Sequence, residues 1–216
     1  MGAAPWAFIR RRMFTGIVQG MASLISVDRS SDVMRITAAF PERALEGVQQ
    51  GASISLDGCC LTVTAFSDSH ATFDLVPETL FRSTFGSVGV GSVVNFERSL
   101  KFGDEVGGHI LSGHVDAVAE VQNVSVLGES RIVTFRIGPE WTKYLFVKGY
   151  IAVNGASLTL THVDSIGGDF SISLIPETLA KTDLGLLKVG TRVNVEVDRT
   201  TQAIVDTVER VLAGRK

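Results

Sequence analysis

Phe14-Thr-Gly-Ile-Val18 returns later in the chain as Leu111-Ser-Gly-His-Val115, a step of 97 residues from position 14 to position 111. The step is too long for a solenoid, whose units run about 20–50 residues, and matches the length of a small domain. Both copies keep the hydroxyl residue, the glycine and the final valine. The pair therefore predicts two similar domains in tandem.

Three further blocks repeat in the same order. They are Leu56-Asp-Gly-Cys-Cys-Leu-Thr62 with Val153-Asn-Gly-Ala-Ser-Leu-Thr159, Pro77-Glu-Thr-Leu80 with Pro176-Glu-Thr-Leu179, and Val94-Asn-Phe-Glu97 with Val193-Asn-Val-Glu196. A chain of 216 residues has room for two domains of about 100 residues, each with its own core. We expect that whatever the protein binds is bound twice.

The composition excludes several classes of protein. With 45% apolar residues, 20% charged residues and a net charge of −3, the chain has no basic patch that favours nucleic acid or an anionic membrane. No stretch reaches the roughly 18 apolar residues of a spanning helix. The two cysteines, Cys59 and Cys60, are adjacent in sequence and poorly placed to bridge each other. This pattern fits the reducing cytoplasm.

The first twelve residues stand outside the repeat. Their apolar stretch precedes the three arginines at 10–12, which is the wrong order for a secretory signal. We expect Met13 to be the natural start, and residues 1–12 to be a disordered extension from an alternative start or an artificial addition.

Short runs of β-forming residues, broken by Gly, Asp, Asn and Ser, recur in each unit. Many short strands in about 95 residues predict a small closed antiparallel barrel. Short helical turns are expected at Pro41–Gly47 and Pro139–Lys148. The predicted strands are Arg35–Phe40, Ala52–Leu56, Leu61–Phe66, Val93–Glu97, Ile132–Arg136, Tyr150–Val153, Phe170–Leu174 and Arg192–Val197.

The pattern changes at the C-terminus. Ile204, Val205, Val208, Val211 and Leu212 have the spacing of one helix face, with charged residues on the other. Thr200 or Thr201 can serve as N-cap. The stripe could dock on its own barrel or pack against the same helix of other subunits, and spacing alone gives both equal weight.

The quoted blocks, together with Gly107-Gly-His-Ile-Leu-Ser-Gly-His114 and Thr201-Gln-Ala-Ile-Val-Asp206, resemble the riboflavin synthase family of the α-chain type. The resemblance runs from Met13 to the C-terminus. It implies an all-β fold of two six-stranded Greek-key barrels, 13–109 and 110–199, and a trimerisation helix in 200–216. It also implies a transferase that works without a cofactor or metal.

The implied reaction is the dismutation of two molecules of 6,7-dimethyl-8-ribityllumazine. One molecule donates a four-carbon unit to the other, which gives riboflavin and 5-amino-6-(D-ribitylamino)uracil. The implied partners are a second substrate molecule in each active site and two further copies of the chain. The active site would form between the N-barrel of one subunit of a homotrimer and the C-barrel of its neighbour.

Residues that differ between the two halves are candidates for catalysis. His114 replaces Ile17 in an otherwise shared block, and an imidazole that titrates near neutrality can move a proton. The resemblance places Ser53 beside His114, and it makes Asp198 face the site from a neighbouring subunit. Asp198 has an equally weighted alternative, a favourable charge at the start of the terminal helix.

Cys60 and Thr62 share one face of a predicted strand, as do Ser157 and Thr159 in the second half. Small polar groups among apolar neighbours suit the edge of a planar heterocycle. Cys60 has two further interpretations, as a thiolate nucleophile or as a small apolar residue. Cys59, on the opposite face, is expected to pack in the core.

The resemblance implies contacts to lumazine and its ribityl chain from both halves. In the first half Val76-Pro77 replaces the family's usual Met-Lys, which leaves any basic contribution there open. Gly16 and Gly113 are expected to let the backbone approach a flat ring. The full expected set is Gly16, Ile17, Val18, Cys60, Leu61, Thr62, Asp74, Leu75, Val76, Pro77, Glu78, Thr79, Gly113, His114, Val115, Lys148, Ser157, Leu158, Thr159, Leu174, Ile175, Pro176, Glu177 and Thr178.

Of the other histidines, His109 is expected to be structural, and His70 and His162 to lie in exposed turns. The main alternative function is a lumazine- or flavin-binding antenna protein without catalysis. The intact Cys-Cys-Leu-Thr and Gly-Gly-His segments favour the enzyme. A flavin domain of a reductase is less favoured, since no Gly-rich dinucleotide fingerprint follows a strand.

Overall fold

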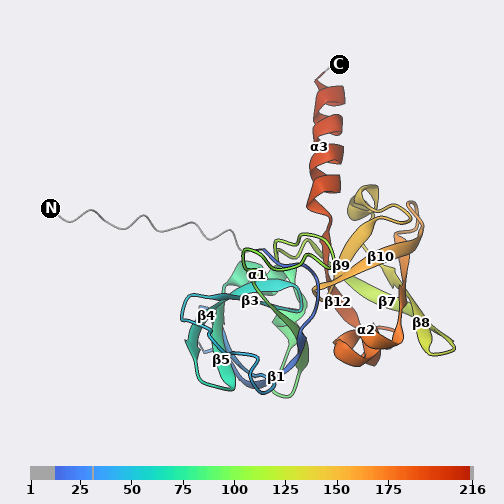
Figure 1. The fold of residues 1–216 in the computed structure, drawn as a ribbon. Coiled ribbons are helices and arrows are strands. Elements are labelled where there is room, and N and C mark those ends of the chain that lie inside the picture. The colour runs from blue at the N-terminus through green and yellow to red at the C-terminus, as the bar shows by residue number, and fades with distance from the viewer. Residues whose placement is uncertain (1–12, 31, 215–216) are drawn as a thin grey trace.

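The computed structural model describes residues 13–30 and 32–214. They form two closed six-stranded antiparallel barrels followed by one long helix, which confirms the predicted fold class (Figure 1). The expectation of a disordered extension concerns residues 1–12, which lie outside the described residues. No helix in the described part of the chain is long and apolar enough to cross a membrane.

The first barrel has the strand order β1-β2-β5-β4-β3-β6. Three hairpin-connected strands lie beside an earlier strand that reaches them by a long connection, which is a Greek key. Along β4, side chains alternate between buried and half-buried, as a closed barrel requires. The strands are β1 Gly20–Asp28, β2 Met34–Ala39, β3 Ser53–Leu56, β4 Cys59–Phe66, β5 His70–Leu75 and β6 Val93–Arg98.

The second barrel repeats this order as β7-β8-β11-β10-β9-β12. Each barrel encloses its own apolar core. In the second core the rings of Phe135 and Phe170 stack with centroids 5.1 Å apart. The strands are β7 Ala117–Leu127, β8 Ser130–Arg136, β9 Tyr150–Val153, β10 Ala156–Val163, β11 Asp169–Leu174 and β12 Arg192–Val197.

The repeated Pro-Glu-Thr-Leu blocks form two short helices that sequence reasoning did not predict, α1 Pro77–Arg82 and α2 Pro176–Lys181. Each has proline in its first turn and an ion pair between residues four apart, Glu78 with Arg82 and Glu177 with Lys181. Short 3₁₀ helices follow at η1 Thr84–Ser87 and η3 Asp183–Leu186.

One of the two expected helical turns forms, as the 3₁₀ helix η2 Pro139–Tyr144. The other stretch, Pro41–Gly47, contains turns but no helix. Arg43 has φ +65 there, and this left-handed conformation interrupts any helical run.

The terminal helix α3 spans Arg199–Ala213. The expectation that Thr200 or Thr201 caps it is wrong, because the Asp198 carboxylate accepts from the Thr201 backbone N–H over 2.7 Å. This carboxylate also accepts from the Thr201 hydroxyl. Aspartate is a strong N-cap, and its charge suits the positive end of the helix dipole.

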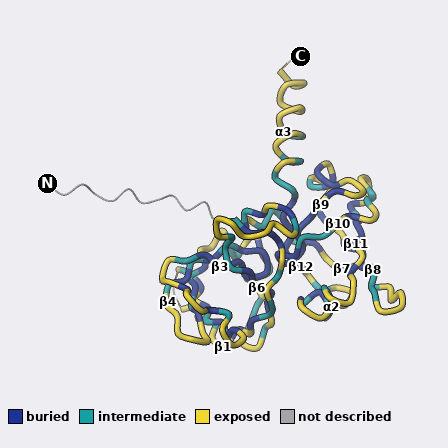
Figure 2. Tube along the Cα trace, viewed as in Figure 1, coloured by how far each residue is buried: buried dark blue, intermediate teal, exposed yellow. Residues whose placement is uncertain are grey.

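The helix α3 projects away from both barrels, and its surface is largely exposed (Figures 1 and 2). Near its base, Val205 packs against the second core and the Tyr144 hydroxyl donates to Asp206 over 2.6 Å. Beyond that, Ile204 is 60% exposed and Val208 is 51% exposed. The single chain therefore leaves most of the predicted apolar stripe uncovered.

Buried amides join the two barrels. Asn95 on β6 donates from Nδ2 to the Asn154 carbonyl over 2.9 Å, and Asn194 on β12 donates to the Asp57 carbonyl over 2.9 Å. Asn95 and Asn194 belong to the repeated Val-Asn-x-Glu blocks. The internal repeat is therefore also an approximate two-fold relation between the barrels, and these amides fix their relative position.

Candidate active site

The opening segments of the two units cross over, so that each lies on the other unit's barrel. Phe14 and Leu111 form a two-way backbone bridge, with both N–H···O distances 2.9 Å. Beyond the bridge, the Gly16 carbonyl accepts from the Ser157 N–H over 2.8 Å, and the Gly113 carbonyl accepts from the Cys60 N–H over 2.7 Å. Each candidate site is thus built from both halves of the chain.

A buried glutamate holds each opening segment. Glu97 accepts from the Thr15 backbone N–H over 2.7 Å, from the Thr15 hydroxyl over 2.8 Å and from the Gly16 N–H over 3.0 Å. Burial raises the pKa of Glu97, while these hydrogen bonds oppose the rise.

Glu196 holds the other segment in the same way. It accepts from the Ser112 N–H and hydroxyl, both over 2.7 Å, and from the Gly113 N–H over 2.9 Å. Burial raises its pKa as well. The repeated glutamate therefore has a structural reason: it secures the crossover.

Gly16 and Gly113 have φ +74 and +73. A Cβ on Gly16 would lie 2.5 Å from the Ser157 Cβ, and one on Gly113 would lie 2.6 Å from the Cys60 Cβ. The glycines thus let the opening segments approach β10 and β4. We expected these glycines to let the backbone approach a flat ligand, but the backbone approaches a strand of the other barrel instead.

A cavity of about 360 Å³ lies between the first barrel and the crossed segment of the second. It has a suitable size for one small heterocycle. It brings together six of the expected contact residues from β4, α1 and the crossed segment, namely Cys60, Glu78, Thr79, Gly113, His114 and Val115. Cys59, Arg82, Ser83, Asp116 and Trp141 complete the lining.

His114 is exposed, and no described residue hydrogen-bonds to its imidazole. Its backbone is fixed, because its carbonyl accepts from Arg199 Nη2 over 2.7 Å. Arg199 also pairs with Asp116 over 2.8 Å, so the first residue of α3 braces this segment. The imidazole is available to a ligand, and its backbone is held in place.

The adjacent cysteines have different environments. Cys59 is buried in the first core, and desolvation strongly raises the pKa of its thiol, which keeps it protonated. Cys60 is half-buried and lines the cavity. These positions confirm that Cys59 packs in the core and that the two side chains point to opposite sides of β4.

The second barrel presents the related surface. Gly16, Ile17 and Val18 lie against it, with Val18 packed on the second core. On β10, Ser157 and Leu158 are half-buried and Thr159 is exposed. Next to them, Lys148 is exposed and its N–H donates to the Leu160 carbonyl over 2.8 Å. The outer members of this surface are Ile175, Pro176, Glu177 and Thr178, and Thr178 is half-buried.

Asp198 lies elsewhere in the single chain. With His109, Tyr150 and Arg199 it lines a separate cavity of about 450 Å³, which shares no lining residue with the cavity at Cys60. Its carboxylate is engaged as the N-cap of α3. Of its two expected roles, the structure shows the one at the helix start.

The remaining expected site residues differ in how far they are buried. Leu61, Leu75 and Leu174 are core residues, so only their backbones can reach a ligand. Asp74 on β5 pairs with Arg35 over 2.7 Å, which lowers the pKa of Asp74. Ser53 is buried on β3 opposite Thr62. Val76 and Pro77 are exposed after β5.

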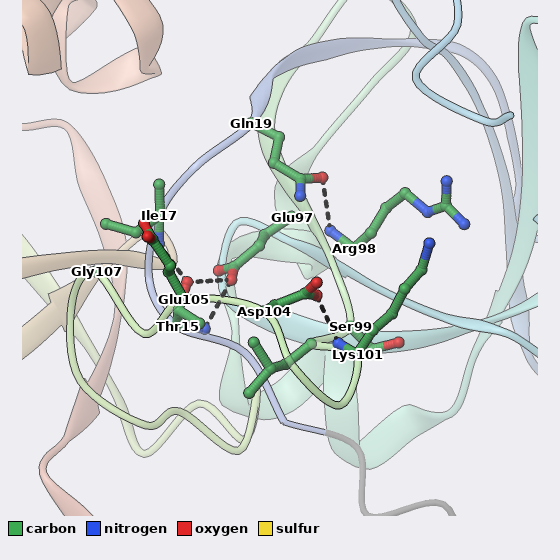
Figure 3. A pocket seen from close by; sticks show the side chains of 11 residues that line it. Thr15, Ile17, Gln19, Glu97, Arg98, Ser99, Lys101, Asp104, Glu105 and Gly107 are labelled. Carbon is green, nitrogen blue, oxygen red and sulfur yellow. Dashed lines mark hydrogen bonds between the residues drawn. The ribbon is translucent and has the colours of Figure 1, made fainter.

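Figure 3 shows a larger cavity, of about 530 Å³, beside Glu97 and the connection between the barrels. Its lining includes the buried Thr15 and Glu97, and the exposed Lys101 and Asp104. Ile17 is the one expected contact residue that lines it. Among the described residues no cluster of three or more His, Cys, Asp or Glu side chains could hold a metal ion.

Comparison with known proteins agrees with this doubled geometry. The model of the lumazine binding domain matches twice, at residues 15–99 and 112–198. Riboflavin synthase of Escherichia coli (strain K12) is 46% identical over 205 residues, which cover 94% of this chain and 95% of that protein. The chain belongs to the riboflavin synthase family.

A second riboflavin synthase and a solved structure are also similar to this chain. Riboflavin synthase of Chlamydia pneumoniae is 42% identical over 202 residues, covering 94% of this chain and 98% of its own. The crystal structure of LumP complexed with 6,7-dimethyl-8-(1'-D-ribityl) lumazine superimposes with a TM-score of 0.76 at 30% identity, covering 85% of this chain and 98% of that chain.

Sequence reasoning missed Glu97, Glu196, Arg82 and Trp141 around the candidate site. The two glutamates lay inside a repeated block that had been quoted without assigning them a role. The available signal was the recurrence of a glutamate at the same place in both halves. Trp141 has no such signal, because it reaches the cavity from η2 of the other barrel.

Proposed function

We propose that the protein is a riboflavin synthase, which converts two molecules of 6,7-dimethyl-8-ribityllumazine into riboflavin and 5-amino-6-(D-ribitylamino)uracil. The observation that carries this is the pair of related surfaces, each completed by the crossed segment of the other unit. A dismutation needs two sites for two identical molecules. Since one lumazine loses the four carbons that the other gains, no oxidant, cofactor or metal is needed.

The first step is loss of a proton from the C7 methyl group of one lumazine, whose carbanion is delocalised into the ring. His114 is the candidate acid and base, because its imidazole lines the cavity without a described partner. The His114 carbonyl accepts from Arg199, and the N–H of the preceding Gly113 donates to Glu196, so the backbone on both sides of the imidazole is held. Ser53, Cys60, Thr62 and Asp198 are the remaining candidates.

Ligand contacts follow the two surfaces. Cys60 and Thr62, and Ser157 and Thr159, would meet the edges of the heterocycles. Glu78 and Thr79, and Glu177 and Thr178, would accept from ribityl hydroxyls at the helix starts. Cys60 is assigned as a ligand contact, since its half-buried side chain lines the cavity beside His114 and Thr79.

The orientation of the two bound lumazines supplies the largest share of the rate enhancement. The side chains around the cavity are mild acids and bases, whereas holding two reactants face to face can contribute about 7–11 kcal/mol. Single substitutions at the site are therefore expected to slow the reaction rather than abolish it.

The active site is proposed to form between subunits of a homotrimer. Within one chain, the cavity at Cys60 and the cavity at Asp198 are separate, so the N-barrel of one subunit would face the C-barrel of its neighbour. The uncovered stripe of α3 favours helix packing between subunits over docking on its own barrel. The domains are proposed as 13–109, 110–199 and 200–216, and two free cysteines fit a cytoplasmic location.

The experiment is an incubation of purified protein with 6,7-dimethyl-8-ribityllumazine alone, followed by absorbance. We expect riboflavin to appear without any added cofactor. Tight binding without riboflavin would show instead an antenna or carrier protein, the alternative from another class.

A further inference from the structure

His109 is a buried histidine with one unpaired nitrogen. It is 7% exposed, and its Nδ1 lies 2.7 Å from the Ser157 hydroxyl. Its Nε2 has no hydrogen-bond partner in the described part of the chain. A histidine kept for structure alone is expected to satisfy both nitrogens, so the unpaired one indicates another reason for its presence.

The imidazole is held firmly against Ser157. It stacks on the Tyr150 ring with centroids 5.1 Å apart and an interplanar angle of 16°. The preceding Gly108 passes so close to Thr15 and Ser157 that a Cβ would overlap both. The segment is therefore pinned between the crossed opening segment and β10, and the ring has little freedom to turn away from Ser157.

The protonation state of His109 determines what Ser157 can offer a ligand. Burial lowers the pKa of His109 and Asp198 partly opposes this, so the ring is neutral at pH 7 and carries one N–H. Buried N–H groups without a partner are rarer than buried acceptors without one. The proton is then on Nδ1, which donates to the Ser157 oxygen and leaves the Ser157 hydroxyl proton free.

We propose that His109 is a positioning residue of the second site, which fixes the Ser157 hydroxyl as a hydrogen-bond donor to the lumazine on the C-barrel. This rests on the proposed function. The first site has Cys60 at the matching position, and a thiol is a weak donor. The two lumazines would thus receive hydrogen bonds of different strength, which distinguishes two chemically identical substrates.

Two variants of His109 separate positioning from packing. His109→Phe keeps an aromatic ring against Tyr150 but removes Nδ1, whereas His109→Asn removes the ring but keeps an N–H near the place of Nδ1. The probe is an 8-ribityllumazine with a 7-oxo group in place of the 7-methyl group, which cannot lose the C7 proton. Its binding to each site is followed by fluorescence titration, with Ser157→Ala and Cys60→Ala assigning the two phases.

We expect His109→Phe to weaken binding in the Ser157 phase about five- to tenfold, the range for a lost hydrogen bond, and to leave the Cys60 phase unchanged. His109→Asn should stay close to the wild type. The double variant with Ser157→Ala should lose no more than Ser157→Ala alone. His162→Phe is the matched control, because His162 is an exposed histidine on β10, the strand that carries Ser157.

The opposite order, with His109→Phe like the wild type and His109→Asn weakened, would show a packing role and overturn the inference. Losses that add in the double variant would do the same. In both cases the wild type still binds two probe molecules, and the proposed function stands. A wild type that binds no probe would overturn the proposed function, and this inference with it.

Discussion

Asn95 and Asp183 hold each other across the contact between the barrels. Nδ2 of Asn95 donates to Oδ1 of Asp183 over 2.6 Å, and the Asp183 N–H donates to Oδ1 of Asn95 over 2.7 Å. Asp57 accepts from the Asn95 N–H over 2.7 Å, so one asparagine links two buried carboxyl groups. Burial raises the pKa of Asp183 to about 6, and burial together with the Asp183 charge raises the pKa of Asp57 well above its ordinary value.

Asp57→Asn is expected to stabilise the protein at pH 7.5 by about 1–2 kcal/mol, since it removes a buried charge beside a like charge. The second half of the chain already has asparagine at the matching position, Asn154, where Nδ2 donates to Asp183 over 2.6 Å. Urea unfolding at pH 7.5 measures the change.

The pH dependence has a defined sign. A raised pKa means that the folded protein keeps a proton that the unfolded chain releases, so stability falls as pH rises from about 4 toward 6 and above. The advantage of Asp57→Asn over the wild type should therefore be smaller at pH 5 than at pH 7.5. An equal advantage at both values would contradict this account, and Asp68→Asn, at an exposed position, is the control.

Glu196→Gln and Glu97→Gln test the crossover. Each variant replaces one oxygen of a buried carboxylate that accepts three hydrogen bonds by an amide NH₂ that cannot accept. The loss should reduce the local opening free energy by about 1.5–3 kcal/mol. Glu196→Gln should speed hydrogen exchange at Ser112, Gly113 and also Cys60 of the other barrel. Glu97→Gln should speed exchange at Thr15, Gly16 and Ser157 instead. If each variant loosened only its own barrel, the crossed arrangement would be wrong.

His114→Gln is expected to slow turnover at least about tenfold and leave lumazine affinity nearly unchanged, as for a lost acid or base. Steady-state kinetics separate kcat from KM, and His162→Gln controls for loss of a histidine elsewhere. Unchanged turnover would remove His114 from the mechanism.

The double variant Ile204→Asp with Val208→Asp is expected to convert a trimer into monomers. Two carboxylates in the apolar stripe of α3 would be buried without partners in a packed helix interface. Light scattering gives the mass, and the melting temperature shows whether the barrels remain intact. Arg210→Asp, on the charged face of the same helix, should stay trimeric.

The repeat was enough to predict the barrels, because alternating β-formers in two matched units have few other closed solutions. It did not predict α1 and α2, whose six residues are too short for a helical period. Nor did it predict the crossover, because Gly16 and Gly113 carry no sequence sign of which barrel they approach. That information lies in backbone hydrogen bonds between residues more than 50 positions apart, such as Cys60 with Gly113.

The candidate site was predictable where residues come from one strand or helix, as with Cys60 and Glu78. The sequence was a poorer guide to which side chains on a strand face the ligand. Leu61 on β4 and Leu75 on β5 were expected to contact it, but their side chains are buried in the core. His109 shows the same limit. Its loop suggested a structural residue, and its contact with Ser157 depends on two strands and a linker meeting in space.

The stoichiometry of the reaction tests the central claim most directly. Purified protein is incubated with 6,7-dimethyl-8-ribityllumazine alone, and all three compounds are quantified by chromatography over time. The account predicts two lumazines consumed for each riboflavin and each 5-amino-6-(D-ribitylamino)uracil formed. Lumazine that is bound but not consumed, or riboflavin formed in any other ratio, would contradict it.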